Sequence, residues 1–461
     1  MRPYEISYGA AKIVTGSAHL LTTNKSKILI DCGMFQGKNE HLNHKPLGFD
    51  PREVEALLLT HGHLDHVGRI PLLYKNGFRG KVFAHPATFD IAKVVLLDSA
   101  KLQVEDYQTR LKKAERVGKE HLVTPPLYTP KEVKEILSIM DKHIVEYNVK
   151  TKITKDIKAT FKDAGHILGS SFIEIEIDGK NQVTFSGDLG NRFNDLLPPP
   201  QKPSPTNSLF IETTYGDRNH KDFKESKREF KLAIIDTLLS GGNVIIPSFA
   251  IERAQQILCI LKEMSEEGTL PKESKVFLDS PMATKVTAIY RKWNKFLDKK
   301  CQKYKKHPFE FPQLHLIKTT DDSKKINKIE KGAVIIAGSG MCTGGRILHH
   351  LKHRIWSKKN AIIFVGYQAK GTLGREIIEG AKFIKIFHEE IIVRAKIYTI
   401  NGFSAHADQR ELIEWIKEFK KLNKIFLIHG EYDKQVTFKS VLHNLLGYNA
   451  HIVKMGEKIY V

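Results

Sequence analysis

Cysteine is scarce in this 461-residue sequence: there are four cysteines, and no two of them form a CxxC pair. This spacing disfavours both a disulfide framework and a zinc site built from cysteine alone. The sequence therefore predicts four reduced thiols, as is typical of a cytoplasmic protein, at Cys32, Cys259, Cys301 and Cys342.

Long apolar runs are also missing. Segments such as Ala361–Val365 are far shorter than the roughly 20 residues that a membrane span needs, and Met1–Ile6 contains no apolar core of a signal peptide. We therefore expect no membrane partner. A hydrophobic content of 41% with 27% charged residues is typical of a folded chain. The length allows two or three domains of roughly 150 residues each.

Acidic residues are few compared with basic ones, since 52 Asp and Glu face 73 Lys and Arg and give a net charge of +21. Such an excess favours a polyanionic partner, of which nucleic acid is the most common. The alternative is a lysine-rich surface without a binding role, as runs such as Lys299-Lys300 suggest. The chain has no RGG tract, zinc finger or long basic tail, so nucleic acid would bind a folded surface.

The order of apolar segments predicts an α/β protein with one domain inserted in another. Predicted strands dominate the first part of the chain, at 27–31, 54–59, 81–84, 157–161, 171–177, 183–185 and 208–212. Between them, helices are expected at 90–120 and 130–140, in a segment (90–150) to which we assign no function.

After about residue 215, helices alternate with single buried strands, which is the pattern of a parallel sheet. Those strands are expected at 244–247, 275–279, 333–337 and 361–366. Strand-rich sequence returns after about residue 382. We therefore predict a first domain of residues 1–213 and 382–461, interrupted by an inserted domain at 214–381.

Four residues of metal-binding type lie within six positions, directly after a predicted buried strand. Imidazoles and a carboxylate suit Zn²⁺, with Mn²⁺ or iron as alternatives. A cluster of surface histidines is the other interpretation, but four such residues rarely gather by chance. Four ligands so close together favour two ions over one tetrahedral ion. The residues are His61, His63, Asp65 and His66.

A two-metal site needs more ligands from elsewhere in the chain. Three candidates stand beside glycines at predicted strand ends, where the backbone can approach closely. Each is a weak signal by itself. They are His166, Asp188 and His429.

Together with Asp31, these motifs follow an order and spacing that resemble the metallo-β-lactamase superfamily. The resemblance implies an αβ/βα sandwich with two metal ions, which we expect to be Zn²⁺, at the edge of its sheets. Asp31 matches the position that orients the ligands, and Asp188 matches the ligand that bridges both ions. The resemblance assigns one ion to His61, His63 and His166, and the other to Asp65, His66 and His429.

Three later motifs resemble the β-CASP branch of this superfamily, whose members cleave RNA or DNA. They place Glu212 at a strand end, His406 in a loop of small residues and His429 in the last motif. In DNA-cleaving members the last motif typically carries an aliphatic residue, so His429 favours RNA. The resemblance covers essentially the whole chain. It identifies a ribonuclease related to bacterial and archaeal β-CASP ribonucleases and to the pre-mRNA 3′-end cleavage subunit.

The resemblance also implies roles for the residues. Asp65 is expected to accept the proton of the attacking water, and His406 to protonate the departing 3′ oxygen. Glu212 would orient His406 and keep it protonated, because a nearby carboxylate raises a histidine pKa. Contacts with single-stranded RNA are expected from the inserted domain, where a glycine-rich turn after a predicted strand can offer backbone N–H groups to phosphate and arginines can supply charge. The arginines could equally be ordinary surface residues. The five candidates are Ser339, Gly340, Arg253, Arg346 and Arg375.

Other functions stay open from the sequence alone. A DNA-cleaving nuclease of the same branch is one, and a thioester or lactone hydrolase of the superfamily is another. A non-catalytic RNA-binding subunit would lack metal ligands, whereas every expected ligand type is present. The sequence does not distinguish internal from end-directed cleavage, and it leaves a homodimer open.

Overall fold

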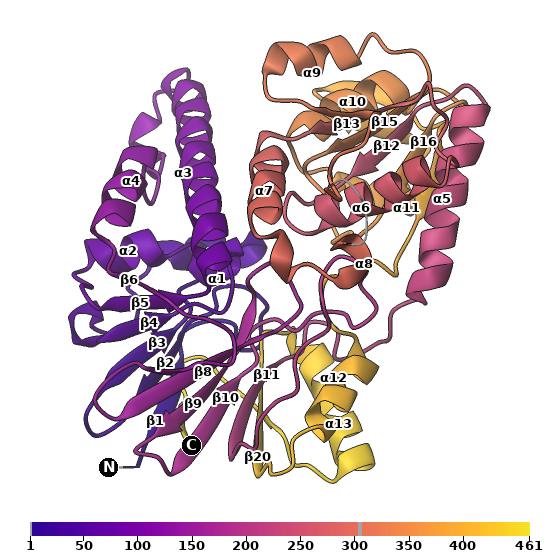
Figure 1. Cartoon of the computed structure of the whole chain (residues 1–461). Helices are drawn as coiled ribbons and strands as arrows, with labels where there is room; N and C mark the ends of the chain where they lie inside the picture. Colours follow the sequence, from indigo (N-terminus) through magenta and orange to yellow (C-terminus); the bar gives the residue numbers. More distant parts are fainter. Residues whose placement is uncertain (1, 303–306) are drawn as a thin grey trace. The chain divides into compact units, whose positions relative to one another are not determined.

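The computed structural model describes residues 2–302 and 307–461. The chain forms two compact units (Figure 1). Unit 1 comprises residues 1–192, 199–219 and 406–461, and unit 2 comprises residues 193–198 and 220–405.

Unit 1 contains two seven-stranded sheets. In the first sheet the neighbouring strands are, in order, β22 (Lys458–Tyr460), β1 (Tyr4–Ser7), β2 (His19–Thr22), β3 (Lys27–Ile30), β4 (Ala56–Leu58), β5 (Lys81–Ala84) and β6 (Lys142–Ile144). In the second they are β21 (His451–Ile452), β20 (Lys424–Ile428), β11 (Ser208–Glu212), β10 (Asn181–Phe185), β9 (Ser171–Ile177), β8 (Ile157–Asp163) and β7 (Lys150–Lys152).

The core of unit 1 lies between these sheets. Residues of the first sheet, such as Ile28 and Leu58, share one buried cluster with the second sheet. Phe185, Phe210 and Phe426 stack across β10, β11 and β20, with 4.7 Å between neighbouring ring centroids. Their stacking follows from the register, which pairs Phe210 with both of the other phenylalanines.

Helices cover the outer faces of the two sheets. Because side chains alternate along a strand, Leu209 and Ile211 of β11 point away from the inner core. They pack with Trp415 of α12 (Gln409–Lys417) and Phe438 of α13 (Tyr432–Leu446). Figure 1 places α1–α4 together beside the first sheet. The unit 1 helices are α1 (Leu64–Val67), α2 (Ile70–Lys75), α3 (Pro86–Glu115), α4 (Pro130–Ile139), α12 (Gln409–Lys417) and α13 (Tyr432–Leu446).

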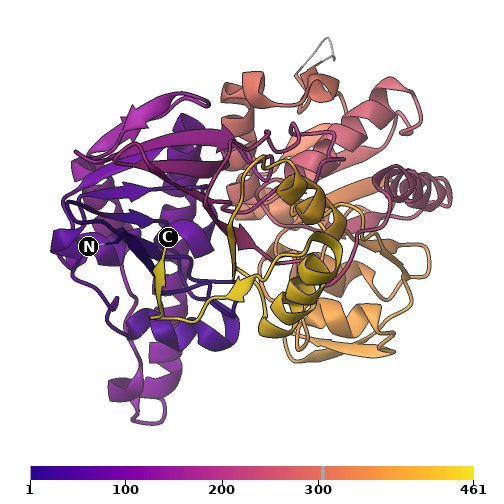
Figure 2. The ribbon, with the colours of Figure 1, turned by 90° about the horizontal axis from the view of Figure 1, so that it is seen from below.

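The two chain ends of unit 1 meet in the first sheet, because β22 pairs antiparallel with β1. Figure 2, which looks from below, shows the N and C labels near one another. In the described part of the chain, no helix has the length and apolar character needed to cross a membrane.

Unit 2 is built on a parallel six-stranded sheet. Its strands follow in the order β14 (Leu314–Leu316), β13 (Lys275–Asp279), β15 (Ala333–Ala337), β12 (Val244–Pro247), β16 (Ala361–Phe364) and β19 (Lys396–Thr399). A separate hairpin joins β17 (Phe383–Ile386) and β18 (Glu389–Ile392). The helices are α5 (Phe223–Leu239), α6 (Arg253–Glu266), α7 (Pro281–Lys292), α8 (Lys299–Gln302), α9 (Thr320–Ile326), α10 (Arg346–Arg354) and α11 (Leu373–Ile378).

The expected strands are found within a few residues of their predicted bounds, and the parallel sheet expected after residue 215 is confirmed. The long helix predicted to begin at residue 90 begins at Pro86, since proline is favoured in a first turn and the His85 side chain caps Ala87. The strand-rich segment after residue 382 groups with unit 2 up to Ala405. The reason is that β19 pairs in parallel with β16.

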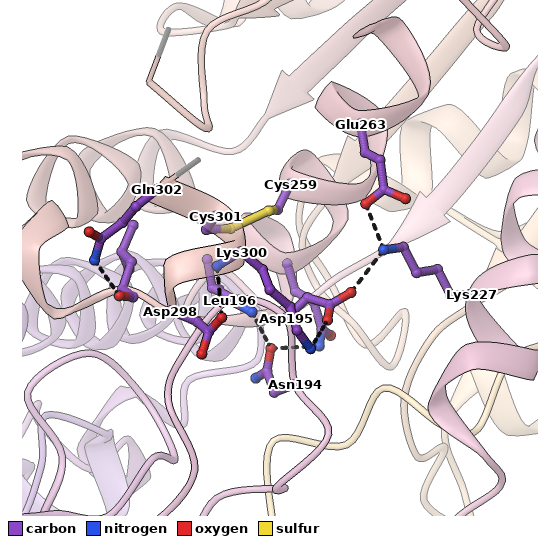
Figure 3. Close-up of a disulfide and its surroundings, with 12 residues drawn as sticks. Asn194, Asp195, Leu196, Lys227, Cys259, Glu263, Asp298, Lys300, Cys301 and Gln302 are labelled. Atoms are coloured by element: carbon purple, nitrogen blue, oxygen red, sulfur yellow. Dashed lines mark hydrogen bonds and ion pairs between the residues drawn. A yellow bond between two sulfur atoms is a disulfide. The ribbon is translucent and has the colours of Figure 1, made fainter. Parts of the chain in front are cut away.

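The prediction of four reduced thiols is wrong for one pair, because a disulfide joins Cys259 and Cys301 (Figure 3). The two residues are 42 apart in sequence, but α6 and α8 bring their Cα atoms to 6.8 Å. Beside the disulfide, Asp195 accepts hydrogen bonds from Lys227 and Lys300. Of the described cysteines, Cys32 and Cys342 are free and buried.

Candidate metal centre

The first group of candidate ligands lies on the loop that follows β4 and continues into α1. His63 immediately precedes α1, and Asp65 and His66 lie within its single turn. Backbone hydrogen bonds hold this turn against the end of β3, for example from the Cys32 N–H to the His66 carbonyl. The approach is so close that a Cβ at Gly33 would lie 1.5 Å from the Asp65 carbonyl oxygen. Glycine is therefore required there.

Four ligand atoms of His61, His63, His166 and Asp188 converge. Nδ1 of His63 lies 3.1 Å from Nε2 of His61 and 3.2 Å from Nε2 of His166. Oδ2 of Asp188 lies 3.5 Å from both of these Nε2 atoms. His61 and His63 share the loop after β4, whereas His166 follows β8 and Asp188 follows β10, so the tertiary fold assembles the set.

A second set consists of Asp65, His66 and His429. Nε2 of His66 and Nε2 of His429 are 3.1 Å apart, and Oδ2 of Asp65 lies 3.6 Å from the latter. Oδ1 of Asp188 lies 3.3 Å from His66 Nε2 and 3.5 Å from His429 Nε2. The two oxygens of Asp188 thus face different sets, which is the geometry of a bridging carboxylate.

These donor sets fit zinc. Nitrogens around a tetrahedral zinc lie about 3.3 Å apart, because each Zn–N bond is about 2.0–2.1 Å long. The histidine N···N distances of 3.1 and 3.2 Å match this spacing. Burial lowers the pKa of His61 well below its usual range and that of His63 to about 4. Both rings are therefore neutral at physiological pH, as metal ligands must be.

The carboxylates are ionised, as ligands also must be. Burial acts to raise the pKa of Asp65, but the ion-pair contact with His429 and the charge of His66 outweigh burial and lower it to about 2. For Asp188, the electrostatic effect of His429 and His66 outweighs burial and holds the pKa well below its usual range. Burial lowers the pKa of His66, but Asp188 and Asp31 raise it well above the ordinary value. A cation must therefore displace a proton from His66, which makes binding pH-dependent.

Asp31 lies directly behind the second set. Its Oδ2 lies 2.7 Å from Nδ1 of His66, and it also accepts a hydrogen bond of 2.8 Å from the Thr60 hydroxyl. Its Oδ1 accepts the Thr60 backbone N–H at 2.8 Å. When His66 donates its Nδ1–H to this carboxylate, Nε2 is left as the metal-binding atom. In that arrangement Asp31 would orient the ring, which is the role that the resemblance implies and which stays a prediction.

His406 and Glu212 form a pair beside the first set. Nδ1 of His406 is 3.2 Å from Oε1 of Glu212 and 3.9 Å from Oδ2 of Asp188. Burial lowers the pKa of His406, but the charge and hydrogen bond of Glu212 outweigh it and raise the pKa to about 9. The Leu189 N–H donates to the same Oε1 at 2.7 Å, and the Ala407 N–H donates to the Leu189 carbonyl. The strand-end loop therefore holds both members in place.

Sequence and structure comparisons identify the family. Residues 12–128 match the metallo-beta-lactamase superfamily, residues 254–377 the Beta-Casp domain and residues 390–453 the Zn-dependent metallo-hydrolase RNA specificity domain. A ribonuclease of Thermus thermophilus is 40% identical over 459 residues, which is 99% of each chain. The chain belongs to the β-CASP ribonucleases of the metallo-β-lactamase superfamily. This confirms the predicted fold class and the predicted metal-dependent ribonuclease class.

More distant relatives also match this chain along most of its length. Among them are proteins named transcription termination factor FttA. The protein from Methanocaldococcus jannaschii is 33% identical, over 96% of this chain and 69% of its own. The protein from Methanosarcina mazei is 31% identical, over 95% and 68%. A crystal structure of a protein of unknown function from Enterococcus faecalis shares the fold at a TM-score of 0.55, with 12% identity over 100% of both chains.

Several hydroxyl groups around the site of this β-CASP ribonuclease, and a buried serine–histidine contact behind Asp31, were not predicted from the sequence. The Thr60 hydroxyl donates a hydrogen bond to Asp31, and the Thr214 hydroxyl lies 3.2 Å from Nδ1 of His429. Behind Asp31, the Ser17 hydroxyl lies 3.3 Å from Nε2 of the buried His19. Serine and threonine occur throughout the chain, so no spacing marks these positions. The TH and TTYG contexts next to the metal motifs are the only local signal.

The five expected RNA contacts all lie in unit 2, in different surroundings. Ser339 and Gly340 follow β15, and the Ser339 hydroxyl accepts the Thr343 N–H at 2.9 Å. Arg375 on α11 donates to Glu379 and is 32% exposed. Two arginines are engaged inside the unit. Arg253 is buried and donates to Gln256, and Arg346 donates to Asp279 at 2.6 Å.

Proposed function

We propose that this chain is a two-zinc ribonuclease that hydrolyses phosphodiester bonds of single-stranded RNA. The observation that carries the proposal is the buried pair of donor sets that share Asp188, with the His406–Glu212 pair beside them. The positive net charge of +21 supports a polyanionic substrate. Cytoplasmic location and a homodimer stay predictions.

The donor distances support two ion positions. His61, His63 and His166 would hold one ion, Asp65, His66 and His429 would hold the other, and Asp188 would contact both. Bound zinc ions supply an activated water and neutralise the charge that develops on the phosphate. The histidine-rich sets favour zinc, with manganese as the alternative.

The protein's own groups move the protons. Asp65 has two carboxylate oxygens, so it can act as a ligand through one and accept the proton of the attacking water through the other. His406 is held protonated by Glu212 and donates a proton to the departing 3′ oxygen. Oε1 of Glu212 also accepts the Leu189 N–H, which fixes this carboxylate beside His406. In unit 2, we assign phosphate contacts to Ser339, Gly340 and Arg375, whose partner Glu379 is exposed. Arg253 and Arg346 would first have to leave partners inside the unit.

The test is cleavage of 5′-labelled RNA and single-stranded DNA of matched sequence by the purified protein. We expect RNA to be cut, a chelator to abolish cutting, and His406→Ala to slow it by about 10²–10⁴-fold while zinc stays bound. His121→Ala, at an exposed histidine of unit 1, is the matched control and should retain full activity. Fragment lengths distinguish internal from end-directed cleavage. Intact RNA in the presence of two bound zinc ions would contradict the proposal, and preferential cutting of DNA would favour the DNA-cleaving alternative.

A further inference from the structure

Two aromatic side chains are exposed at the carboxyl edge of the parallel sheet in unit 2. Phe249 follows β12 and is 44% exposed, and Tyr367 follows β16 and is 46% exposed. Strands β12 and β16 are neighbours in the sheet. Since parallel strands end at the same edge, the two rings lie on the same rim of unit 2. Ligands of open α/β sheets bind at this carboxyl edge.

Glycine and glutamine residues hold this rim rigidly. The Phe249 ring packs so closely on Gly340 that a Cβ there would lie 2.9 Å from ring atom Cδ2, and a Cβ at Gly366 would lie 3.7 Å from Cε2. The buried Gln368 ties the two glycine loops together, because its Nε2 donates to the Gly340 carbonyl at 3.0 Å and to the Gly366 carbonyl at 3.1 Å. The rim is therefore ordered before any ligand arrives, which lowers the entropy lost on binding.

Groups that suit phosphate lie on the same loops. Ser339 immediately precedes Gly340 in the chain. A hydrogen bond of 3.2 Å from the Gly374 N–H to the Met341 carbonyl connects this loop with the start of α11. The half-buried guanidinium of Arg375 follows on the first turn of that helix. A hydroxyl and a cation thus accompany the two exposed rings. This combination suits single-stranded nucleic acid, whose phosphates need positive charge and whose bases stack on aromatic rings.

We propose that Phe249 and Tyr367 form a stacking platform for unpaired RNA bases, a role that rests on the proposed ribonuclease function. Every base has a π face, so such a platform accepts any sequence. It rejects paired segments, whose bases are already stacked within a helix. The platform therefore selects single-stranded RNA without reading its sequence.

The test measures binding in the zinc-loaded His406→Ala protein, which keeps the RNA intact. Fluorescence anisotropy compares a labelled oligouridylate with an abasic oligomer of the same length. We expect Phe249→Ala and Tyr367→Ala each to weaken oligouridylate binding about tenfold, with less than about a twofold change for the abasic oligomer. Phe249→Trp and Tyr367→Phe should restore binding. Phe383→Ala, at a 54% exposed ring on the β17–β18 hairpin of the same unit, is the control and should change neither affinity.

Two results would overturn the platform. One is unchanged oligouridylate affinity in both alanine variants. The other is an equal loss for both oligomers, which would indicate contacts with the sugar-phosphate backbone or a general folding defect instead of base stacking. Phe249→Leu keeps an apolar side chain packed on Gly340 but has no aromatic face, so it separates loss of stacking from loss of folding. If Phe249→Ala folds poorly, Phe249→Leu should still show the tenfold weaker binding of oligouridylate. Failure of the parent protein to bind either oligomer would contradict the ribonuclease proposal itself, and the platform with it.

Discussion

Nδ1 of His406 lies 3.2 Å from Oε1 of Glu212, a carboxylate whose side chain is fully buried. An ionised carboxylate at this distance stabilises the imidazolium form. The pKa of His406 is accordingly raised to about 9, against the opposing effect of burial. The pair therefore keeps a proton donor available at neutral pH.

The first prediction concerns the pH dependence of cleavage. A general acid works only while protonated, so kcat should fall as the pH rises through the pKa of His406. Glu212→Gln removes the charge that raises this pKa. The alkaline limb of the kcat–pH profile should therefore shift to lower pH by about one to three pH units. The measurement is kcat from pH 5.5 to 10. Glu414→Gln, on the exposed face of α12, should leave the limb in place, and an unmoved limb in Glu212→Gln would argue against His406 as the acid.

The second prediction concerns Asp31 and metal affinity. In Asp31→Asn, the new amide can donate to Nδ1 of His66, which would place the ring proton on the atom that binds the metal. Loss of such a supporting carboxylate typically weakens metal binding about 10–100-fold. Zinc content after dialysis against graded chelator concentrations measures the effect. The matched control is Asp50→Asn, at a carboxylate that pairs with the exposed Arg52; zinc retention equal to the parent in Asp31→Asn would contradict the assigned role.

The first candidate metal motif was predictable because its ligand-type residues are local. His61, His63, Asp65 and His66 are too dense to be accidental, and the apolar strand before them gives their place in the fold. His166, Asp188 and His429 needed the family resemblance, because each is a single residue beside a glycine. Contacts that depend on packing between distant segments carry no such pattern.

Two examples show this limit. The ion pair between Arg346 and Asp279 connects residues 67 positions apart, so an arginine expected to face RNA is engaged inside unit 2. The disulfide between Cys259 and Cys301 depends on how α6 meets α8. In both cases the partner is chosen by tertiary packing and not by spacing along the chain.

The third prediction concerns the stability of unit 1. Asp156 accepts hydrogen bonds from the hydroxyls of Thr23, Ser26 and Thr154 at 2.5, 2.6 and 3.0 Å. These bonds link the β2–β3 turn of one sheet to the β7–β8 turn of the other. Asp156→Asn leaves one acceptor oxygen where there were two, and we expect a loss of about 1–3 kcal/mol in the free energy of unfolding at pH 7.

The pH dependence of that loss has a definite sign. Burial acts to raise the pKa of Asp156, but the three hydroxyl bonds outweigh it and hold the pKa below the ordinary value of 3.8. The ionised carboxylate therefore adds stability above about pH 4, and this contribution is lost as the pH falls through the lowered pKa. Chemical unfolding of parent and Asp156→Asn should show a difference that shrinks below pH 4. An equal difference at pH 3 and pH 7 would exclude this origin.

The fourth prediction concerns the cysteines. Burial raises the pKa of Cys32 to about 11 and that of Cys342 to about 12, so neither free thiol should react in the folded protein. Alkylation of protein purified without reductant should label no cysteine when native, two after unfolding, and four after unfolding with reductant. Peptide mass spectrometry should find Cys259 linked to Cys301 in the unreduced sample. Four labels without reductant would show that the pair is reduced.

The same disulfide should stabilise unit 2. It joins residues 42 positions apart. Closing a loop of that length lowers the entropy of the unfolded chain and adds about 2–4 kcal/mol to the free energy of unfolding. Reductant should therefore lower the unfolding temperature of the protein, and Cys301→Ser should make that temperature insensitive to reductant. Cys342→Ser is the comparison, because it leaves the disulfide intact and should keep the response to reductant. A response that survives in Cys301→Ser would mean that the effect of reductant arises elsewhere in the chain.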